Sequence, residues 1–199
     1  MIYLIRHGQT EFNREDRVQG RVDSPLTEHG RAQARAMGER LAALIAAEPG
    51  DWRLETSPLG RARQSAEIIA ETAGLPAPAV EPRLIEVSYG EMEGLLREEV
   101  DRRWPEFADA VGMFGRAPGG ETIEALAERV GDWLAAARAA PAGRRLVAVT
   151  HAGVVRVARG LYLGLGHDDM RAMDKPQDVI FRLHEGRIDR LECQLAAQP

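Results

Sequence analysis

The chain has 199 residues and a formal net charge of −5, with 44% hydrophobic and 29% charged residues, which excludes general disorder. An acidic chain lacks the basic footprint of a nucleic-acid-binding protein, and no apolar run approaches the roughly 20 residues that a membrane span needs. There is no signal-peptide pattern and the single Cys193 cannot form an internal disulfide, so we predict a cytoplasmic protein with neither a nucleic-acid nor a membrane partner.

We expect a single domain over residues 1–199, because this length is typical of one domain and no linker, repeat or low-complexity tract divides it. Of the 26 basic residues only Lys175 is a lysine. Arginine is the better bidentate partner for phosphate, but abundant alanine beside abundant arginine indicates a codon bias. We therefore give weight only to arginines at informative positions.

The first half of the chain alternates short apolar runs with helical patterns. The runs predict buried strands at residues 2–5, 52–55 and 79–81. Apolar residues at helical spacing predict two helices between them: one from an N-cap at Thr27 to Pro49, and one from a cap at residues 56–58 to Gly74. The polar stretch 9–24 has no periodic pattern, so we interpret it as a loop.

The second half completes an α/β pattern. Residues 95–118 hold two short amphipathic pieces, which we interpret as a small helical cap insertion. The remaining predicted elements are a helix that starts at 119–122, a strand at 146–149, a helix after Gly153, and a hairpin of strands 179–183 and 187–191. Strands alternating with helices indicate a three-layer α/β/α sandwich around a mostly parallel sheet.

Two of the predicted strands end in a histidine followed by small residues. The first leads into Arg6-His7-Gly8, and the strand at 146–149 leads into Thr150-His151-Ala152-Gly153. Ligands of open α/β sheets bind outside the carboxyl ends of the strands, so parallel neighbours would bring His7 and His151 together at one edge. The alternative is that two histidines simply begin loops, and their matched positions argue against it.

Arginines add positive charge near this edge. Arg6 ends a buried strand, where its charge is costly unless an anion meets it. Arg61 and Arg63 lie in the first turns of a predicted helix, whose free N–H groups also favour an anion. Residues two apart on a helix point in different directions, and the sequence leaves open which of the two faces the site.

Several motifs resemble, in chain order, the signature of the histidine phosphatase superfamily, also called the phosphoglycerate mutase-like family. The first are Leu4-Ile5-Arg6-His7-Gly8-Gln9-Thr10, Asn13, Gln19-Gly20 and Asp23-Ser24-Pro25-Leu26-Thr27-Glu28-His29-Gly30. They continue with Ser57-Pro58-Leu59-Gly60-Arg61-Ala62, Leu84-Ile85-Glu86, Tyr89-Gly90, Glu93-Gly94, Gly119-Gly120-Glu121 and Thr150-His151-Ala152-Gly153-Val154-Val155-Arg156. Arg-His-Gly alone is weak evidence, whereas an ordered set that runs to residue 156 is specific.

The resemblance implies a phosphoryl-transfer site with a histidine nucleophile. Through it, His7 is assigned the attack on phosphorus and Glu86 the role of proton donor. The groups that it places around the phosphate are Arg6, Arg61 and His151. It also implies substrate contacts for four further residues: Asn13, Gln19, Gly20 and Ala152.

The chemistry of phosphate monoesters agrees with these residue types. The monoester is a dianion whose hydrolysis is very slow without a catalyst, and guanidinium groups match its oxygens. Nearby arginine charges should keep His7 unprotonated and nucleophilic, and His151 is most useful as a cation that shares the charge of the transition state. We predict an activity that needs no metal ion or cofactor and that survives EDTA.

The superfamily includes both hydrolases and cofactor-dependent mutases. Only residues 95–118 lie between Gly94 and Gly119, where mutase-like members carry a long insertion, so we favour a phosphomonoesterase for a small phosphorylated metabolite. A phosphoglycerate mutase is the alternative, with weak support from Tyr89. A non-catalytic phospho-ligand binding protein is a third hypothesis, against which the complete set of catalytic groups argues.

Some positions carry weaker expectations. Ser57 either caps its helix, which we favour, or binds the first histidine, and the His167-Asp168-Asp169 run lacks the spacing of a metal site. Apolar residues of the cap form either a lid that reads the leaving group or a cap that packs on itself: Trp104, Phe107, Met113 and Phe114.

The C-terminal part of the chain departs from the family pattern at Lys175-Pro176-Gln177-Asp178, which puts in doubt any substrate contact carried over there. We expect His29 and His184 to be exposed and Cys193 to pack on a strand. The last hairpin is a candidate homodimer surface, although no pattern in the sequence shows it.

Overall fold

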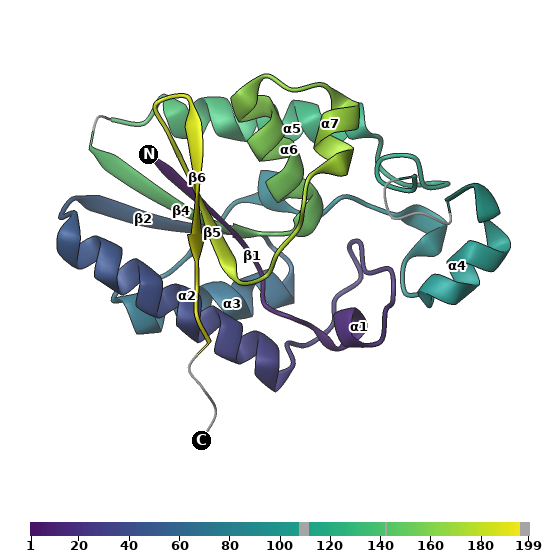
Figure 1. Ribbon diagram of the computed structural model, residues 1–199, viewed down its shortest axis with the longest axis horizontal. Coiled ribbons are helices and arrows are strands. Elements are labelled where there is room, and N and C mark those ends of the chain that lie inside the picture. Colours follow the sequence, from purple (N-terminus) through teal and green to yellow (C-terminus); the bar gives the residue numbers. More distant parts are fainter. Residues whose placement is uncertain (108–111, 142, 196–199) are drawn as a thin grey trace.

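The computed structural model describes residues 1–107, 112–141 and 143–195, and its described part is built on a six-stranded sheet (Figure 1). The strand order is β3-β2-β4-β1-β5-β6. The strands are β1 (Ile2–Arg6), β2 (Asp51–Thr56), β3 (Ala79–Val80), β4 (Arg144–Thr150), β5 (Val179–His184) and β6 (Arg187–Glu192). Strands β1 to β4 pair in parallel, whereas β5 runs antiparallel to β1 and β6, so the predicted mostly parallel sheet is confirmed.

Helices cover both faces of the sheet and form the three predicted layers (Figure 1). One face carries α2 (Glu28–Ala47) and α3 (Gly60–Ala73). The other carries α5 (Ile123–Arg138), α6 (Ala152–Leu163) and α7 (His167–Ala172). Shorter elements are α1 (Glu11–Arg14), α4 (Arg97–Arg103) and 3₁₀ turns at Pro82–Leu84, Gly90–Met92 and Pro105–Phe107.

The alternation of side chains along β1 divides the core in two. Ile2 and Leu4 pack in the cluster under α5 and α6, while Tyr3 and Ile5 pack in the cluster under α2 and α3. Successive strand residues point to opposite faces, so a continuous apolar run is the pattern of a strand buried on both sides. The parallel pairing of β1 with β4 places the carboxyl ends of both strands at the same edge of the sheet.

A helix begins where the sequence predicts when its capping residue is adjacent in the chain, and it begins elsewhere when the capping residue is distant. Thr27 caps α2 as predicted, accepting the N–H of Gly30 at 3.0 Å. Helix α3, by contrast, begins at Gly60, two residues later than a cap at residues 56–58 implies. Its first N–H groups, those of Gly60 and Arg61, donate to the carboxylate of Asp23 at 2.6 and 3.2 Å. The anion at this helix N-terminus is therefore a side chain of the protein itself.

The segment 9–24 is not wholly a loop, because it contains the single turn α1. Thr10 accepts the N–H of Asn13, and the Asn13 side chain accepts the N–H of Thr10, which makes a reciprocal capping box. One turn is too short to produce an apolar periodicity, and the same holds for α7.

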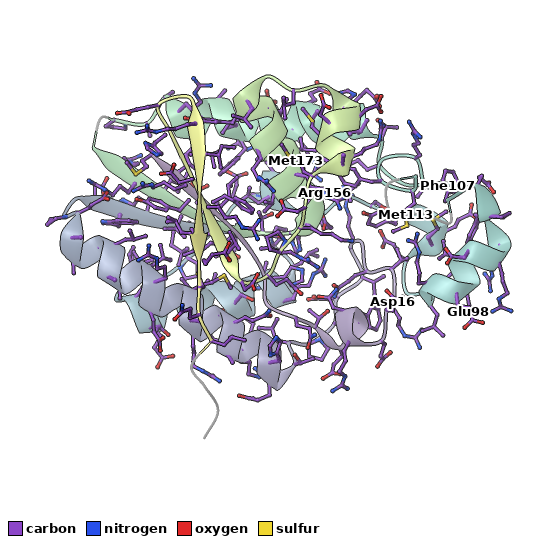
Figure 2. The ribbon with its side chains drawn as sticks, in the orientation of Figure 1. Asp16, Glu98, Phe107, Met113, Arg156 and Met173 are labelled. Atoms are coloured by element: carbon purple, nitrogen blue, oxygen red, sulfur yellow. The ribbon has the colours of Figure 1, made fainter. Side chains whose placement is uncertain are left out.

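The cap insertion lies beyond the carboxyl ends of the strands, where α4 stands apart from the layers (Figure 1). It has its own small core of buried residues: Val18, Met92, Val100, Met113 and Ala117. Trp104 and Phe107 pack against this core, and Figure 2 shows Met113 between α4 and the sheet. Phe114 instead belongs to the core under α5. The cap thus largely packs on itself, and only Met113 of the four apolar candidates lines the pocket described next.

Candidate active site

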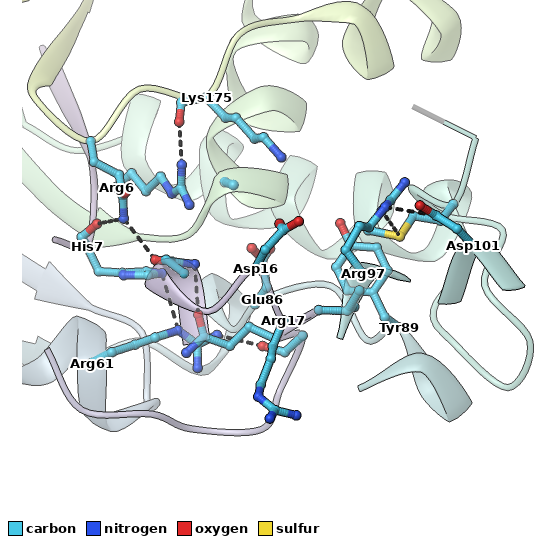
Figure 3. A pocket seen from close by; sticks show the side chains of 17 residues that line it. Arg6, His7, Asp16, Arg17, Arg61, Glu86, Tyr89, Arg97, Asp101 and Lys175 are labelled. Atoms are coloured by element: carbon cyan, nitrogen blue, oxygen red, sulfur yellow. Dashed lines mark hydrogen bonds and ion pairs between the residues drawn. The ribbon is translucent and has the colours of Figure 1, made fainter. Parts of the chain in front are cut away.

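A pocket of about 580 Å³ opens at the carboxyl end of β1, between the sheet and the cap (Figure 3). Eight of the nine residues proposed from the sequence line it: Arg6, His7, Asn13, Gln19, Gly20, Arg61, Glu86 and Ala152. The ninth, His151, does not line the pocket, but its ring contacts that of His7. The fold therefore brings together residues that are up to 146 positions apart, counting from Arg6 to Ala152.

The two histidines meet because β1 and β4 are parallel neighbours in register. Arg6 pairs with Thr150, and the N–H of His7 donates to the Thr150 carbonyl at 2.9 Å. The imidazole rings then lie with centroids 5.1 Å apart and planes inclined by 62°. The matched strand ends predicted this juxtaposition.

The hydrogen bonds of His7 select one tautomer. Its Nδ1 lies 2.7 Å from the Gly8 carbonyl oxygen, which can only accept, so Nδ1 carries the proton. Its Nε2 is therefore unprotonated, and its lone pair accepts the Nε–H of Arg61 at 3.2 Å. Burial, with the charges of Arg61 and Arg6, lowers the pKa of His7 well below its ordinary value. A neutral imidazole with a lone pair on Nε2 is the form that can attack an electrophile.

The turn after His7 depends on two glycines that touch. A Cβ at Gly8 would lie 2.1 Å from the Gly30 carbonyl oxygen, and a Cβ at Gly30 would lie 2.0 Å from the Gln9 carbonyl oxygen. Both contacts are with backbone, which cannot move aside cheaply. The start of α2 is thus packed directly against the turn that holds His7.

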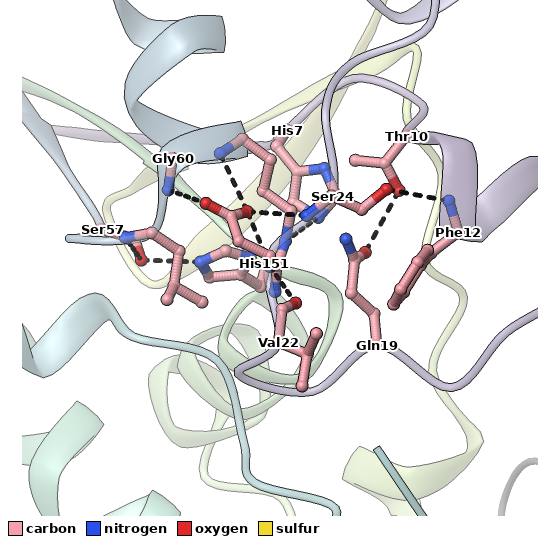
Figure 4. A network of polar contacts seen from close by, with 12 residues as sticks. His7, Thr10, Phe12, Gln19, Val22, Ser24, Ser57, Gly60 and His151 are labelled. Carbon is pink, nitrogen blue, oxygen red and sulfur yellow. Dashed lines mark hydrogen bonds and ion pairs between the residues drawn. The ribbon is translucent and has the colours of Figure 1, made fainter. Parts of the chain in front are cut away.

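Arg61 is the arginine of α3 that faces the site, and it is 2% exposed, whereas Arg63 is exposed. Besides His7, its guanidinium donates to the carbonyls of Gly20 and Val22 at 2.5 and 2.9 Å and to Asp23 at 3.2 Å (Figure 4). These partners fix the guanidinium beside Nε2 of His7.

Arg6 approaches the pocket from the end of β1. It donates Nη1 to the backbone carbonyl of Lys175, and its buried Nε has no hydrogen-bond partner among the described residues. Burial and neighbouring cations lower the pKa of Arg6 to about 10, so it remains a cation at neutral pH. An unsatisfied buried donor on a cation is the arrangement that an anionic ligand would complete.

His151 is fully buried and differs from the expectation of a cation. Burial, followed by the charge of Arg61, lowers the pKa of His151 well below its ordinary value, so its ring is neutral here. Its Nε2 lies 2.6 Å from the Ser57 hydroxyl, and its Nδ1 has no partner within the described ranges. Ser57 thus binds the second histidine, not the first, and α3 is capped by Asp23 instead.

Glu86 also lines the pocket and is 7% exposed. Its carboxylate accepts the N–H of Gly153 at 3.2 and 3.3 Å and the N–H of Val87 at 2.9 Å. Two backbone donors from different segments therefore hold its orientation. A Cβ at Gly153 would lie 2.7 Å from the Glu86 Oε1, so this approach requires glycine.

Amide side chains complete the wall between His7 and α1. Asn13 accepts from the amide of Gln177 at 3.1 Å, and that same amide donates to the His7 carbonyl at 3.1 Å. Gln19 accepts from Thr10 at 3.3 Å, and its buried Nε2 has no partner in the described part of the chain (Figure 4). Gly20 has a φ of 53°, which favours glycine, and contributes its carbonyl to Arg61.

The pocket also has lining residues that sequence reasoning did not assign. They include Lys175 and Gln177 from the loop after α7, and Asp16, Arg97 and Asp101 from the cap side. The segment 175–178, which departs from the family pattern, therefore reaches the site. The feature of the sequence that could have pointed to Lys175 is that it is the only lysine in the chain.

The remaining histidines lie elsewhere. His29 is exposed, as expected, but His184 is half-buried, because its Nε2 lies 2.7 Å from Asp189 in the last hairpin. Cys193 is buried in the core under α2 and α3. Within the described ranges, no three His, Cys, Asp or Glu side chains are grouped to hold a metal ion, and no helix is long and apolar enough to cross a membrane.

Comparison with known proteins identifies the family to which the chain belongs. The model of the histidine phosphatase superfamily (branch 1) matches residues 2–190. A curated relative from Klebsiella pneumoniae subsp. pneumoniae, with the name "Probable phosphoglycerate mutase GpmB", is 40% identical over 197 residues, which cover 97% of this chain and 85% of the relative. A relative that matches nearly the whole of this chain thus carries the name of a phosphoglycerate mutase.

Solved structures show the same fold. A mycobacterial glucosyl-3-phosphoglycerate phosphatase in complex with VO3 is 27% identical with a TM-score of 0.79, covering 97% of this chain and 98% of its own. Bacillus stearothermophilus YhfR is 28% identical with a TM-score of 0.77, covering 96% and 95%. These similarities confirm the predicted α/β/α sandwich along the chain.

Proposed function

Because the chain belongs to the histidine phosphatase superfamily, we propose that it is a phosphomonoesterase that hydrolyses a small phosphorylated metabolite through a phosphohistidine on His7. The observation that carries this proposal is the state of His7: a neutral imidazole whose Nε2 lone pair lies beside the Arg61 guanidinium, in the pocket that Arg6 also lines. Oxygen nucleophiles of carboxylates would add negative charge at this point, whereas the imidazole adds none.

In the first step, Nε2 of His7 forms a bond to phosphorus as the bond to the ester oxygen breaks. Arg6 and Arg61 neutralise the charge of the phosphoryl oxygens, and the free amide of Gln19 and the side chain of Asn13 supply further polar contacts. Glu86 gives a proton to the leaving alkoxide. A positioned general acid typically contributes about 10²–10⁴ in rate.

In the second step, water attacks the phosphohistidine, and Glu86 takes the proton that water releases. Inorganic phosphate leaves and His7 returns with its original tautomer, because the Gly8 carbonyl holds the Nδ1 proton throughout. The bound dianion would favour protonation of His151, whose Nδ1 is the buried nitrogen without a partner. In this proposal the protein's own cations supply the positive charge, and the activity needs no metal ion or cofactor.

A phosphoglycerate mutase is the second candidate, favoured by the 40% identity to a relative with that name. The phosphatase proposal draws support from the 27% identical phosphatase structure, whose fold matches over nearly the whole of both chains. The two differ in the acceptor of the phosphoryl group, which is water in one and a phosphoglycerate hydroxyl in the other.

Phosphate release and phosphoglycerate interconversion should be measured together on the purified protein. We expect release from p-nitrophenyl phosphate and from at least one small metabolite, and an acid-labile mass increase of one phosphoryl group that His7→Ala removes. His29→Ala is the matched control, because His29 is exposed on α2, away from the pocket. Interconversion of 2- and 3-phosphoglycerate that depends on 2,3-bisphosphoglycerate, without phosphate release, would reject hydrolysis. No labelling of His7 would reject both.

A further inference from the structure

We propose that Lys175 selects phosphomonoesters whose leaving group carries a second anionic group, a carboxylate or a further phosphate. This inference rests on the proposed function, because it concerns the part of the substrate that leaves. It assigns a substrate class to the site and a specificity-determining role to a residue in the loop between α7 and β5.

The position of Lys175 is the first observation. Its backbone carbonyl accepts from Arg6, which ties the loop to the end of β1, and its side chain lines the pocket. Figure 3 shows this side chain reaching into the pocket between Arg6 and Arg97. Lys175 therefore lies between the phosphoryl-binding end and the cap.

The balance of charge is the second observation. Arg61 is paired with Asp23 and Arg97 with Asp101, both at 3.2 Å. The side chain of Lys175 makes no hydrogen bond or ion pair with any residue that the structure describes, and Arg6 makes no ion pair within those same ranges. A phosphoryl dianion on His7 would meet Arg6 and Arg61. The Lys175 ammonium is attracted by the Glu86 carboxylate across the pocket, but it has no carboxylate in direct contact among the described residues.

The surroundings make that charge costly. The Lys175 residue as a whole is exposed, yet its ammonium is partly desolvated. This desolvation, followed by the charges of Arg156, Arg6 and Arg97, lowers the pKa of Lys175 to about 8. Arg156 is 6% exposed, stacks 5.3 Å from the Phe114 ring centroid and has no partner on Nε among the described residues. Several cations around one pocket repel one another, and an anionic ligand group relieves that repulsion.

A competing role for Lys175 is contact with the transferred phosphoryl group itself. The two roles differ in which substrates lose affinity when the charge is removed. Contact with the phosphoryl group would affect every phosphomonoester equally, whereas contact with the leaving group affects only substrates that carry the second anion.

The experiment compares kcat/KM for matched substrates in wild type, Lys175→Gln, Lys175→Arg and Arg63→Gln. 3-Phosphoglycerate against glycerol 3-phosphate isolates a carboxylate, and fructose 1,6-bisphosphate against fructose 6-phosphate isolates a second phosphate. For each pair, the selectivity is kcat/KM of the substrate with the second anion divided by kcat/KM of the substrate without it. We expect Lys175→Gln to lower this ratio for at least one pair by about 10- to 100-fold, mainly through KM, as loss of a charged hydrogen bond implies. Lys175→Arg should retain most of the ratio, and Arg63→Gln, which removes an exposed charge outside the pocket, should retain all of it.

Two results would overturn the inference without touching the proposed function. One is a wild-type enzyme that releases phosphate but prefers the neutral member of both pairs. The other is an equal fall for both members of each pair in Lys175→Gln, which would place the lysine on the transferred group. Failure of the wild type to release phosphate from p-nitrophenyl phosphate and from all four metabolites would instead contradict the proposed function.

Discussion

Arg61 donates its Nε–H to Nε2 of His7 over 3.2 Å, so the nitrogen that attacks phosphorus in the proposed reaction is held by a guanidinium. In the proposed reaction Nε2 exchanges this hydrogen bond for the bond to phosphorus, and the Nε–H of the Arg61 guanidinium can then donate to a phosphoryl oxygen. Its position depends on the loop of Gly20, Val22 and Asp23, and Asp23 also caps α3.

Asp23 should therefore contribute to both stability and rate, and two variants separate these effects. Asp23→Ala removes the cap and should lower the free energy of unfolding by about 1 kcal/mol, whereas Asp23→Asn keeps a capping oxygen and should stay within a few tenths of the wild type. Both variants lose the charge that pairs with Arg61, so both should lower kcat. Urea denaturation and steady-state kinetics measure the two effects. Equal destabilisation by Asn and Ala would contradict the role as a cap.

The buried histidines predict how stability depends on pH. The folded-state pKa values of His7 and His151 are lowered, so below about pH 6.5 the unfolded chain binds protons that the folded chain does not. The free energy of unfolding should consequently fall as pH decreases below that value, by up to about 1.4 kcal/mol per pH unit for each histidine. Stability measured by urea denaturation between pH 7.5 and 5 should show this slope. The slope should decrease in His7→Gln and His151→Gln, and an unchanged slope in both would contradict the prediction.

Much of this site can be predicted from the sequence, because two strand patterns lead to the same edge of an open α/β sheet. A buried run that ends in histidine identified both β1 and β4, and the ligand-binding edge of an open sheet then placed His7 next to His151. The choice between Arg61 and Arg63 could not be made this way, because it depends on the rotation of α3 against the sheet. That rotation is fixed by packing across the core.

Contacts between distant segments account for what the sequence did not predict. Asp23 caps a helix 37 residues away, and Ser57 binds a histidine 94 residues away, so neither has a signature near its partner. Lys175 lies in irregular backbone, where no periodicity indicates which side chains face the pocket.

Ser57 should act as a positioning residue for His151. Ser57→Ala removes the 2.6 Å hydrogen bond to Nε2, which leaves the buried ring without a partner on either nitrogen in the described structure. A lost hydrogen bond at a buried group costs about 1–3 kcal/mol, so we expect kcat to fall by about tenfold or more. KM should change less, because Arg6 and Arg61 still bind the phosphate. A purely structural role would instead lower the melting temperature with kcat unchanged.

Gly153 should control the proton transfer through Glu86. In Gly153→Ala the new Cβ would meet the Glu86 Oε1 at 2.7 Å and the Phe114 ring at 2.8 Å, so the carboxylate must move from its two backbone donors. We expect kcat/KM, which reports the transfer to His7 and not the later attack of water, to fall by about 10²-fold for alkyl phosphates, whose leaving oxygen needs a proton. It should fall far less for p-nitrophenyl phosphate, whose phenolate leaves unaided.

Gly131→Ala is the matched control for that substitution, because Gly131 lies within α5 and a Cβ there meets only the Leu161 Cδ1, at 3.7 Å. Alanine in a helix interior should stabilise the protein by up to about 1 kcal/mol, and both substrates should be hydrolysed at the wild-type rate. Equal losses of kcat/KM for the alkyl and aryl phosphates in Gly153→Ala would show that the glycine serves binding or folding and contradict its role in proton transfer through Glu86. A selective loss for alkyl phosphates would show that the contact between the α6 backbone at Gly153 and the Glu86 carboxylate controls protonation of the leaving group.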